Sequence, residues 1–142
     1  MGHYSVTICT QDKRCFLGDI IEIEEEPGAA IQLSPAGRII EKIWKLIPQW
    51  YPNVSLDEWQ IMPNHFHGIL FIEEQKEDVT LGLIINQFKG ECTKEIRNAS
   101  FKDFAWQPRF HDHIVRNGKD LERVQCYIRE NPVAWLYGED DD

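Results

Sequence analysis

Residues 62–72 read Met-Pro-Asn-His-Phe-His-Gly-Ile-Leu-Phe-Ile, so that one phenylalanine separates His65 from His67. Pro63 and Asn64 favour a turn, and the apolar run that follows is typical of a strand in the centre of a sheet. Because successive side chains of a strand point to opposite faces, both imidazoles leave the same face. Two neutral imidazoles side by side supply half of a metal site.

The chain before this strand alternates between strand and helix patterns. Alternation and β-branched residues indicate strands, and Ser34 followed by Pro35 is typical of a helix start, with serine as the cap and proline in the first turn. The expected elements are a strand at 4–10, a hairpin of strands at 16–23 and 30–33, a helix from Ser34 to Ile47, and a strand at 54–62.

The chain after the histidine strand continues in the same manner. The expected elements are a helix capped by Thr80 and ending near Arg97, a strand at 110–115, and a helix from about Lys119 to Asn131. Pro132 is expected to end the last helix, because the residue before a proline is pushed out of helical geometry. The order predicts one α+β domain over residues 1–142. We expect a ferredoxin-like antiparallel sheet with helices packed on one face, an added N-terminal hairpin and a C-terminal helix.

Composition and charge restrict the possible functions. The 142 residues are 42% hydrophobic and 27% charged, with no apolar run long enough to span a membrane, so we expect a cytoplasmic globular protein. The four cysteines form no CxxC pair, which argues against a zinc ribbon. A net charge of −9 does not favour nucleic-acid binding. However, residues 86–130 carry nine basic and seven acidic side chains, so this stretch is compatible with a small DNA-binding surface.

The predicted last helix carries two polar side chains beside its apolar stripe. Leu121, Val124 and Ile128 form the stripe at helical spacing, and Tyr127 and Asn131 lie at its rim one turn apart. A phenol ionises near pH 10 and is a poor nucleophile unless a base or a cation assists it. Two imidazoles and one amide oxygen would suit Mg²⁺ or Mn²⁺ at a phosphodiester. Taken singly, a histidine pair in a strand more often packs, and a rim tyrosine more often anchors a helix.

Three motifs in order resemble one known family. Residues 62–68 resemble the MPNHxH signature of the single-tyrosine HUH transposases, the insertion-sequence-200-like enzymes and their REP-associated relatives. Residues 106–116 and 127–132 resemble the following motif and the tyrosine helix of that family, and residues 4–10 resemble its first strand. The likeness extends over nearly the whole chain.

The resemblance implies a metal-dependent endonuclease and strand transferase that acts on single-stranded DNA with hairpin ends. By position, Tyr127 would be the nucleophile that forms a covalent 5′-phosphotyrosine, and His65, His67 and Asn131 would hold Mg²⁺ or Mn²⁺. Some family members dimerise so that one partner's tyrosine helix completes the other's site, and REP-associated members can act alone. A homodimer is therefore one expectation.

Further residues are candidates for DNA contact. They are Lys89, Arg109, Arg116, His111 and His113. The second histidine pair could also line the site, and Trp59 and Trp106 could stack on bases or lie in the core.

Two alternatives to the transposase reading stay open. One is a REP-associated domesticated protein, or a protein of the same fold that binds DNA hairpins without cutting them; the acidic end at 138–142 is compatible with a domesticated or REP-associated role in place of active mobility. The other is a metal-dependent hydrolase that uses His65 and His67 with a water nucleophile.

Overall fold

The computed structural model describes residues 2–73 and 78–138, so the end of the acidic tail lies outside the described residues. The strands are β1 (Gly2–Cys9), β2 (Gly18–Glu22), β3 (Ala29–Leu33), β4 (Val54–Met62), β5 (His65–Ile72) and β6 (His111–Ile114). The helices are α1 (Pro35–Trp44), α2 (Ile47–Trp50), α3 (Leu81–Asn98) and α4 (Gly118–Leu136), with a short 3-10 turn, η1, at Gln11–Lys13.

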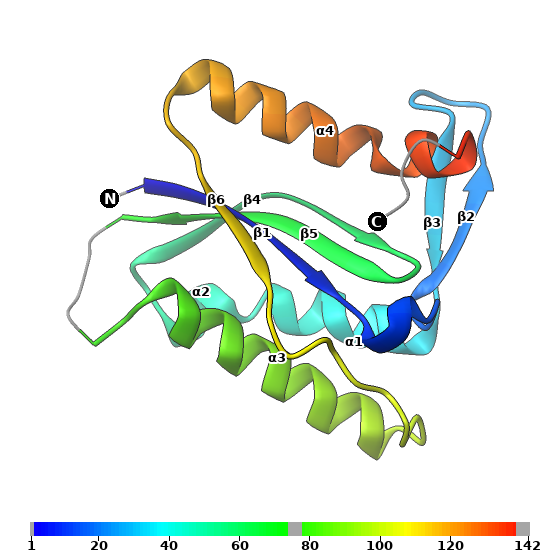
Figure 1. Cartoon of the computed structure of the whole chain (residues 1–142), viewed down its shortest axis with the longest axis horizontal. Helices are drawn as coiled ribbons and strands as arrows, with labels where there is room; N and C mark the ends of the chain where they lie inside the picture. Colours follow the sequence, from blue (N-terminus) through cyan, green and yellow to red (C-terminus); the bar gives the residue numbers. More distant parts are fainter. Residues whose placement is uncertain (1, 74–77, 139–142) are drawn as a thin grey trace.

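Four strands form one antiparallel sheet in the order β4-β5-β1-β6, and β2 and β3 form a separate two-stranded ribbon (Figure 1). The histidine strand β5 is central, since it pairs with β1 on one side and β4 on the other. The predicted α+β class with an antiparallel sheet is confirmed. None of the helices in the described residues is long and apolar enough to cross a membrane.

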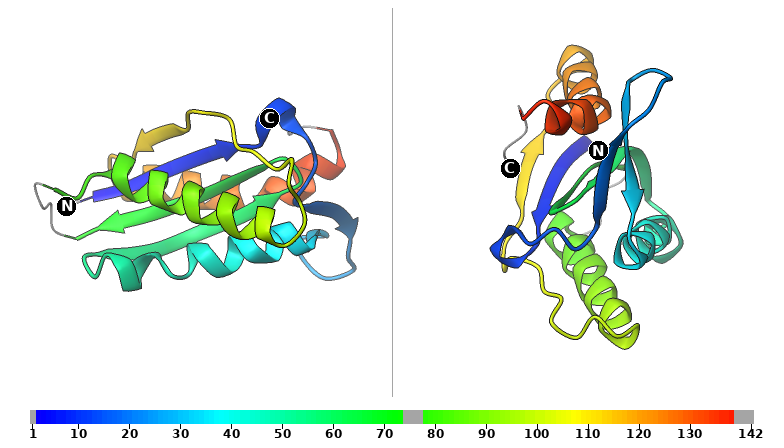
Figure 2. Two further views of the ribbon diagram at one scale, coloured as in Figure 1. Left: turned by 90° about the horizontal axis from the view of Figure 1, so that it is seen from below. Right: turned by 90° about the vertical axis from the view of Figure 1, so that its right-hand side faces the viewer.

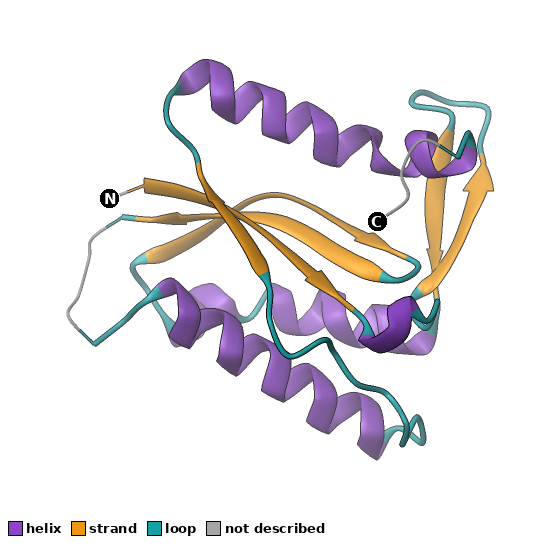
Figure 3. Cartoon of the chain, in the orientation of Figure 1, coloured by secondary structure: helices purple, strands orange, loops and turns teal. Residues whose placement is uncertain are grey.

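Helices cover both faces of the sheet, as Figures 2 and 3 show. Helices α1 and α3 lie together on one face, which confirms the predicted packing of the first two helices. Their core centres on an aromatic cluster in which Trp44 and Phe66 have ring centroids 4.5 Å apart and Phe88 meets both rings. All three side chains are fully buried. Phe66 comes from β5, so the residue between the two histidines anchors the strand in this core.

Helix α4 packs on the opposite face of the sheet. The predicted stripe forms this contact: Val124 and Ile128 are buried against Ile69, with Leu121 at the edge. Ile69 follows His65 and His67 at every second position of β5, so all three side chains leave the sheet on the α4 side. The two faces of β5 therefore carry the main core and the histidine pair.

Two expected helix boundaries were wrong. Pro132 lies inside α4, which continues to Leu136. An interior proline costs a helix about 3 kcal/mol, but Asn131 and Pro132 are buried and the last turns pack against β2 and β3, so tertiary contacts offset the loss. The first helix, by contrast, ends at Trp44, and Pro48 lies in the first turn of the separate helix α2.

Substitution of Gly68 tests how tightly β5 is held. A Cβ atom there would lie 2.8 Å from Trp44 and 2.9 Å from Phe66, too close for either ring. We expect Gly68→Ala to lower the free energy of unfolding by about 1–3 kcal/mol, as overpacked cores do. In Gly90→Ala the new methyl group meets nothing within 4 Å, so this helix substitution should stabilise the protein instead. Urea denaturation of both variants measures the difference, and an unchanged midpoint for Gly68→Ala would contradict the close packing.

Candidate functional site

His65 and His67 lie buried at the centre of the sheet face that α4 covers, with 2% and 8% of their surfaces exposed. The strand register sets their neighbours. His67 stands opposite Thr7 of β1 and Gln60 of β4, and His65 stands opposite Cys9 and Met62. Both imidazoles therefore belong to rows of side chains that cross neighbouring strands on one face.

Each histidine has a fixed hydrogen-bond partner. His65 Nδ1 lies 2.9 Å from Asn64 Oδ1, and because an amide oxygen only accepts, Nδ1 carries the proton and the lone pair of neutral His65 is on Nε2. His67 Nε2 lies 2.9 Å from the Ser5 hydroxyl. Burial, with a smaller contribution from His65, lowers the pKa of His67 to about 4. His67 is therefore neutral at physiological pH, the form that binds metals.

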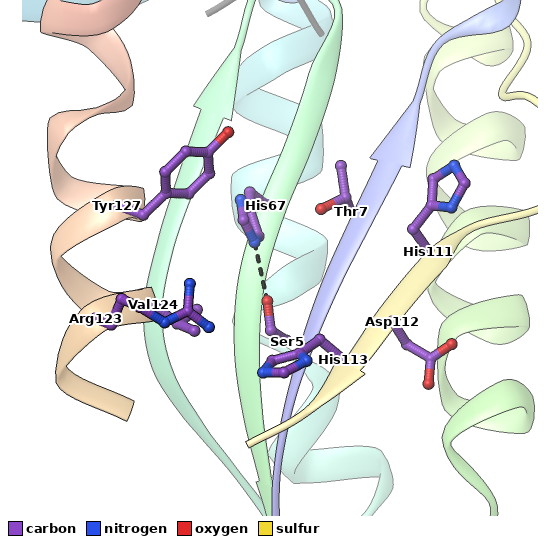
Figure 4. Close-up of a pocket in the computed structure, with 9 residues that line it drawn as sticks. All are labelled: Ser5, Thr7, His67, His111, Asp112, His113, Arg123, Val124 and Tyr127. Atoms are coloured by element: carbon purple, nitrogen blue, oxygen red, sulfur yellow. Dashed lines mark hydrogen bonds between the residues drawn. The ribbon is translucent and has the colours of Figure 1, made fainter. Parts of the chain in front are cut away.

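Helix α4 brings Tyr127 of the same chain into contact with His67. The rings of Tyr127 and His67 meet edge to face with centroids 5.5 Å apart. Both line a cavity of about 360 Å³ together with Ser5, Thr7, His111 and Arg123 (Figure 4). Tyr127 is 48% exposed, whereas its neighbour on the helix, Ile128, is fully buried. The tyrosine thus combines a fixed position with access for a substrate.

Asn131 lies one helical turn after Tyr127 and is completely buried. Neither its amide oxygen nor its amide nitrogen has a hydrogen-bond partner among the described residues. A buried amide without partners costs about 1–3 kcal/mol, so a ligand that pairs with this group would stabilise the folded protein. No three His, Cys, Asp or Glu side chains of the described segments could jointly hold a metal ion. A site at the histidine pair therefore needs a ligand of another type, such as this amide.

The second histidine pair lies on β6 and faces the same cavity. His111 is opposite Thr7 and His113 is opposite Ser5, so both share the sheet face of His67. His113 Nε2 lies 2.9 Å from an Asp120 carboxylate oxygen. His113 thus connects β6 to the start of α4. His111 is exposed and forms part of the cavity wall.

The other predicted DNA contacts are spread over the surface. Lys89 lines a different cavity, beside α3, and Arg109 and Arg116 are exposed on either side of β6. Trp106 is 8% exposed in the core, and Trp59 is half-buried with the Lys45 ammonium 5.8 Å from its ring. Trp106 therefore offers no open face for a base.

Polar contacts fix the position of α4 along its length. A β-bulge between Leu56 and Trp59 breaks the regular register of β4. Within the bulge, Asp57 accepts a 2.8 Å hydrogen bond from Gln125, and Glu58 lies 3.4 Å from Arg129. These contacts come from the same turns of α4 as Tyr127 and therefore restrict rotation of the helix.

Sequence reasoning missed Ser5, Thr7, Arg123 and Asp120. The first two share the histidine face only because β1 pairs with β5, and the sequence alone does not show which strands are neighbours. Arg123 precedes Tyr127 by one turn, so the helical spacing that identified Asn131 could also have identified it.

Asp120 provides a test of how β6 is joined to α4. Its carboxylate accepts hydrogen bonds from the Arg116 main-chain N–H, Arg123 and His113, and these contacts hold its pKa well below the ordinary value. A carboxyl with a depressed pKa stabilises the fold above its unfolded pKa, and the contribution is lost as the pH falls through the folded value. Asp120→Asn should therefore be less stable than the wild type at pH 7.

Urea denaturation at several pH values should show this difference shrinking below about pH 4, where the unfolded chain begins to take up the proton. A stability difference that stays the same down to pH 3 would show that the carboxylate charge is not responsible.

Comparisons with known proteins identify relatives of this chain. A family model described as "Transposase IS200 like" matches residues 28–131. A Haemophilus influenzae protein without a functional name is 33% identical over 94% of this chain and 82% of its own length. An Escherichia coli REP-associated tyrosine transposase is 32% identical, but the match covers 58% of this chain and 47% of that relative.

Among solved structures, a REP-associated tyrosine transposase bound to a REP hairpin has the same fold. The TM-score is 0.65 at 21% identity, over 98% of this chain and 70% of that one. The family model includes the histidine strand and the tyrosine of α4. The chain therefore belongs to the IS200-like transposase family.

Proposed function

We propose that this protein nicks and rejoins single-stranded DNA through a covalent bond to Tyr127. The observation that carries the proposal is the contact between the Tyr127 and His67 rings, 5.5 Å apart at the edge of an open cavity. A tyrosine on a helix rim and a histidine pair in a strand are ordinary features when apart. Here Tyr127 contacts His67 in one cavity, and His65 shares the same face of β5 with His67, so Tyr127 would be a nucleophile next to a candidate metal-ligand pair.

In the proposed step, the Tyr127 oxygen attacks the phosphorus of a phosphodiester. A bond forms between that oxygen and phosphorus, and the bond from phosphorus to the 3′ oxygen breaks. The phenol loses its proton to solvent, and the departing 3′ oxygen takes one up, which leaves a 5′-phosphotyrosine and a free 3′-hydroxyl. Attack by a 3′-hydroxyl on the phosphotyrosine reverses the step and joins a strand without an external energy source.

His65, His67 and Asn131 would hold a divalent cation, Mg²⁺ or Mn²⁺. Such a cation polarises the phosphodiester oxygens and orients the scissile bond. Two features of the protein fit this assignment: burial keeps His67 neutral, and the Asn131 amide is buried without a partner among the described residues. The Arg123 guanidinium lines the same cavity one turn before Tyr127, where it would attract the phosphate and keep it near the phenol.

The proposed substrate is single-stranded DNA adjoining a hairpin, because a solved relative is bound to a REP hairpin. Tyr127 and His67 of one chain are already in contact, so we propose a site complete within one protomer. A homodimer that exchanges tyrosine helices stays a prediction, which light scattering of the 16.7 kDa chain would test.

The covalent intermediate provides the direct test. Incubation of the protein with Mn²⁺ and labelled hairpin-flanking single-stranded DNA should yield an adduct that survives denaturing electrophoresis. Tyr127→Phe should form none, because phenylalanine lacks the attacking oxygen. Tyr137→Phe is a matched control, since Tyr137 is 70% exposed at the end of α4 and outside the cavity.

The outcomes separate the alternatives. Cleavage that persists in Tyr127→Phe without an adduct would replace the proposal with a hydrolase that uses water. Tight binding without cleavage on any flanking sequence would leave a hairpin-binding protein of the same fold.

Asn131 can be tested without measuring activity. Leucine has nearly the shape of asparagine and needs no hydrogen bonds, so Asn131→Leu should raise the stability of the metal-free protein by about 1–2 kcal/mol. The same variant should lose the increase in melting temperature that Mn²⁺ confers on the wild type by binding the folded state. A variant that is destabilised without metal, or that Mn²⁺ stabilises as fully as the wild type, would contradict the assignment of Asn131.

A further inference from the structure

A second cavity, of about 490 Å³, lies between α3 and the chain that leads from α3 to β6. Its wall on α3 carries three cationic side chains, Lys89, Lys94 and Arg97, on one side of the helix. Its other wall is the segment 105–108. We call this cavity the α3 groove. It is separate from the tyrosine cavity, since α3 and α4 lie on opposite faces of the sheet (Figure 1).

The charges in the α3 groove are not neutralised by carboxylates. Lys89 donates a 2.9 Å hydrogen bond to the Gln107 carbonyl, and Arg97 donates a 2.9 Å hydrogen bond to the Phe104 carbonyl. These carbonyls position the two cations but carry no net charge. Lys94 is exposed and makes no ion pair among the described residues. None of the residues lining the groove is acidic.

The acidic residues of α3 lie outside the groove. Glu95 forms an ion pair with Lys42 of α1 and so belongs to the other flank of the helix. Partial burial lowers the pKa of Lys89, because it penalises the ammonium form. In a protein with a net charge of −9, a group of three cations, one of them partly desolvated, with no acid among the lining residues is a site that an anion would stabilise.

We propose that the α3 groove binds the phosphate backbone of the duplex stem of hairpin DNA, an inference that rests on the DNA substrate of the proposed function. The groove offers cations but no accessible aromatic face, because Trp106 in its wall is 92% covered. Proteins that hold single strands stack the bases on aromatic rings. A site with cations alone suits phosphates instead, which a duplex presents on its outside.

The chain itself connects this groove to the tyrosine cavity. Residues 105–108 line the α3 groove, and the same segment continues directly into β6, where His111 and His113 line the tyrosine cavity. β6 is the edge strand of the sheet. A stem held by α3 would therefore direct its single-stranded flank around the β6 edge toward Tyr127. Exposed Arg109 lies on this route.

Charge reversal at Lys94 tests the proposal. The probes are a labelled DNA hairpin with a single-stranded flank and an oligonucleotide of the same composition that forms no stem. Phosphate contacts do not depend on sequence, so the hairpin need not be the cognate one. Lys94→Glu is compared with Arg38→Glu, which makes the same charge change at an exposed position of α1 outside both cavities. Thermal melts of both variants establish that they are folded.

We expect Lys94→Glu to weaken hairpin binding several-fold and to reduce the slope of log K against log salt by about one, since one phosphate contact is lost. The affinity and the slope of Lys94→Gln should lie between those of the wild type and those of Lys94→Glu. Arg38→Glu should leave the slope unchanged, and binding of the stemless oligonucleotide should respond equally to both reversals.

Equal effects of Lys94→Glu and Arg38→Glu on the hairpin would overturn the inference. The inference would also be overturned if Lys94→Glu weakened binding of the hairpin and of the stemless oligonucleotide equally, or if it weakened binding of an RNA stem-loop only. A wild-type protein that does not bind the hairpin would overturn it as well. Adduct formation is scored separately. If an adduct forms but the slope change is not specific to Lys94, only the proposal of stem binding in the α3 groove is refuted. If the slope changes but no adduct forms, stem binding in the α3 groove is supported and the proposed nicking chemistry is refuted.

Discussion

The structure depends on the burial of β5 on both faces. Phe66 packs into the aromatic core beneath the sheet, while Ile69 packs against Val124 and Ile128 of α4 above it. This double packing leaves the strand little freedom to shift, because a slip of one residue would exchange its faces. Such a slip would move the histidines into the apolar core. The orientation of His65 and His67 toward α4 is therefore a consequence of core packing.

The same packing gives α4 its functional position. The apolar stripe determines which side of the helix meets the sheet, and Tyr127 lies at the rim of that stripe. Contacts at the start and in the middle of the helix add to this. Asp120 joins its first turn to β6, and the β4 bulge holds its middle through Gln125 and Arg129. On a helix fixed in this way, the proposed nucleophile would need little reorganisation before it meets a phosphodiester.

The distribution of charge is compatible with the proposed action of this acidic protein on DNA. The net charge of −9 arises mainly from residues 1–85, which carry thirteen acidic and six basic side chains. The cations of the α3 groove and Arg123 come from the stretch 86–130, where the balance is slightly basic. In the proposed function, attraction for phosphate would thus be local to two cavities joined by the β6 edge. Long-range steering toward DNA would be weak, which would favour recognition at short distance over nonspecific binding.

The sequence by itself determined the class of fold, the order of its elements and the two motifs of the site. Periodicity and turn residues are local properties, so the strand that carries the histidines and the helix stripe beside Tyr127 could be read from residues close together in the chain. Features that depend on contacts between residues far apart in the sequence were decided only by the tertiary structure. The pairing of β1 with β5 brought Ser5 and Thr7 to His67, and packing against β2 and β3 carried α4 past Pro132. Burial of the Asn131 amide likewise required the assembled sheet, because desolvation depends on every element around a side chain and on no local pattern.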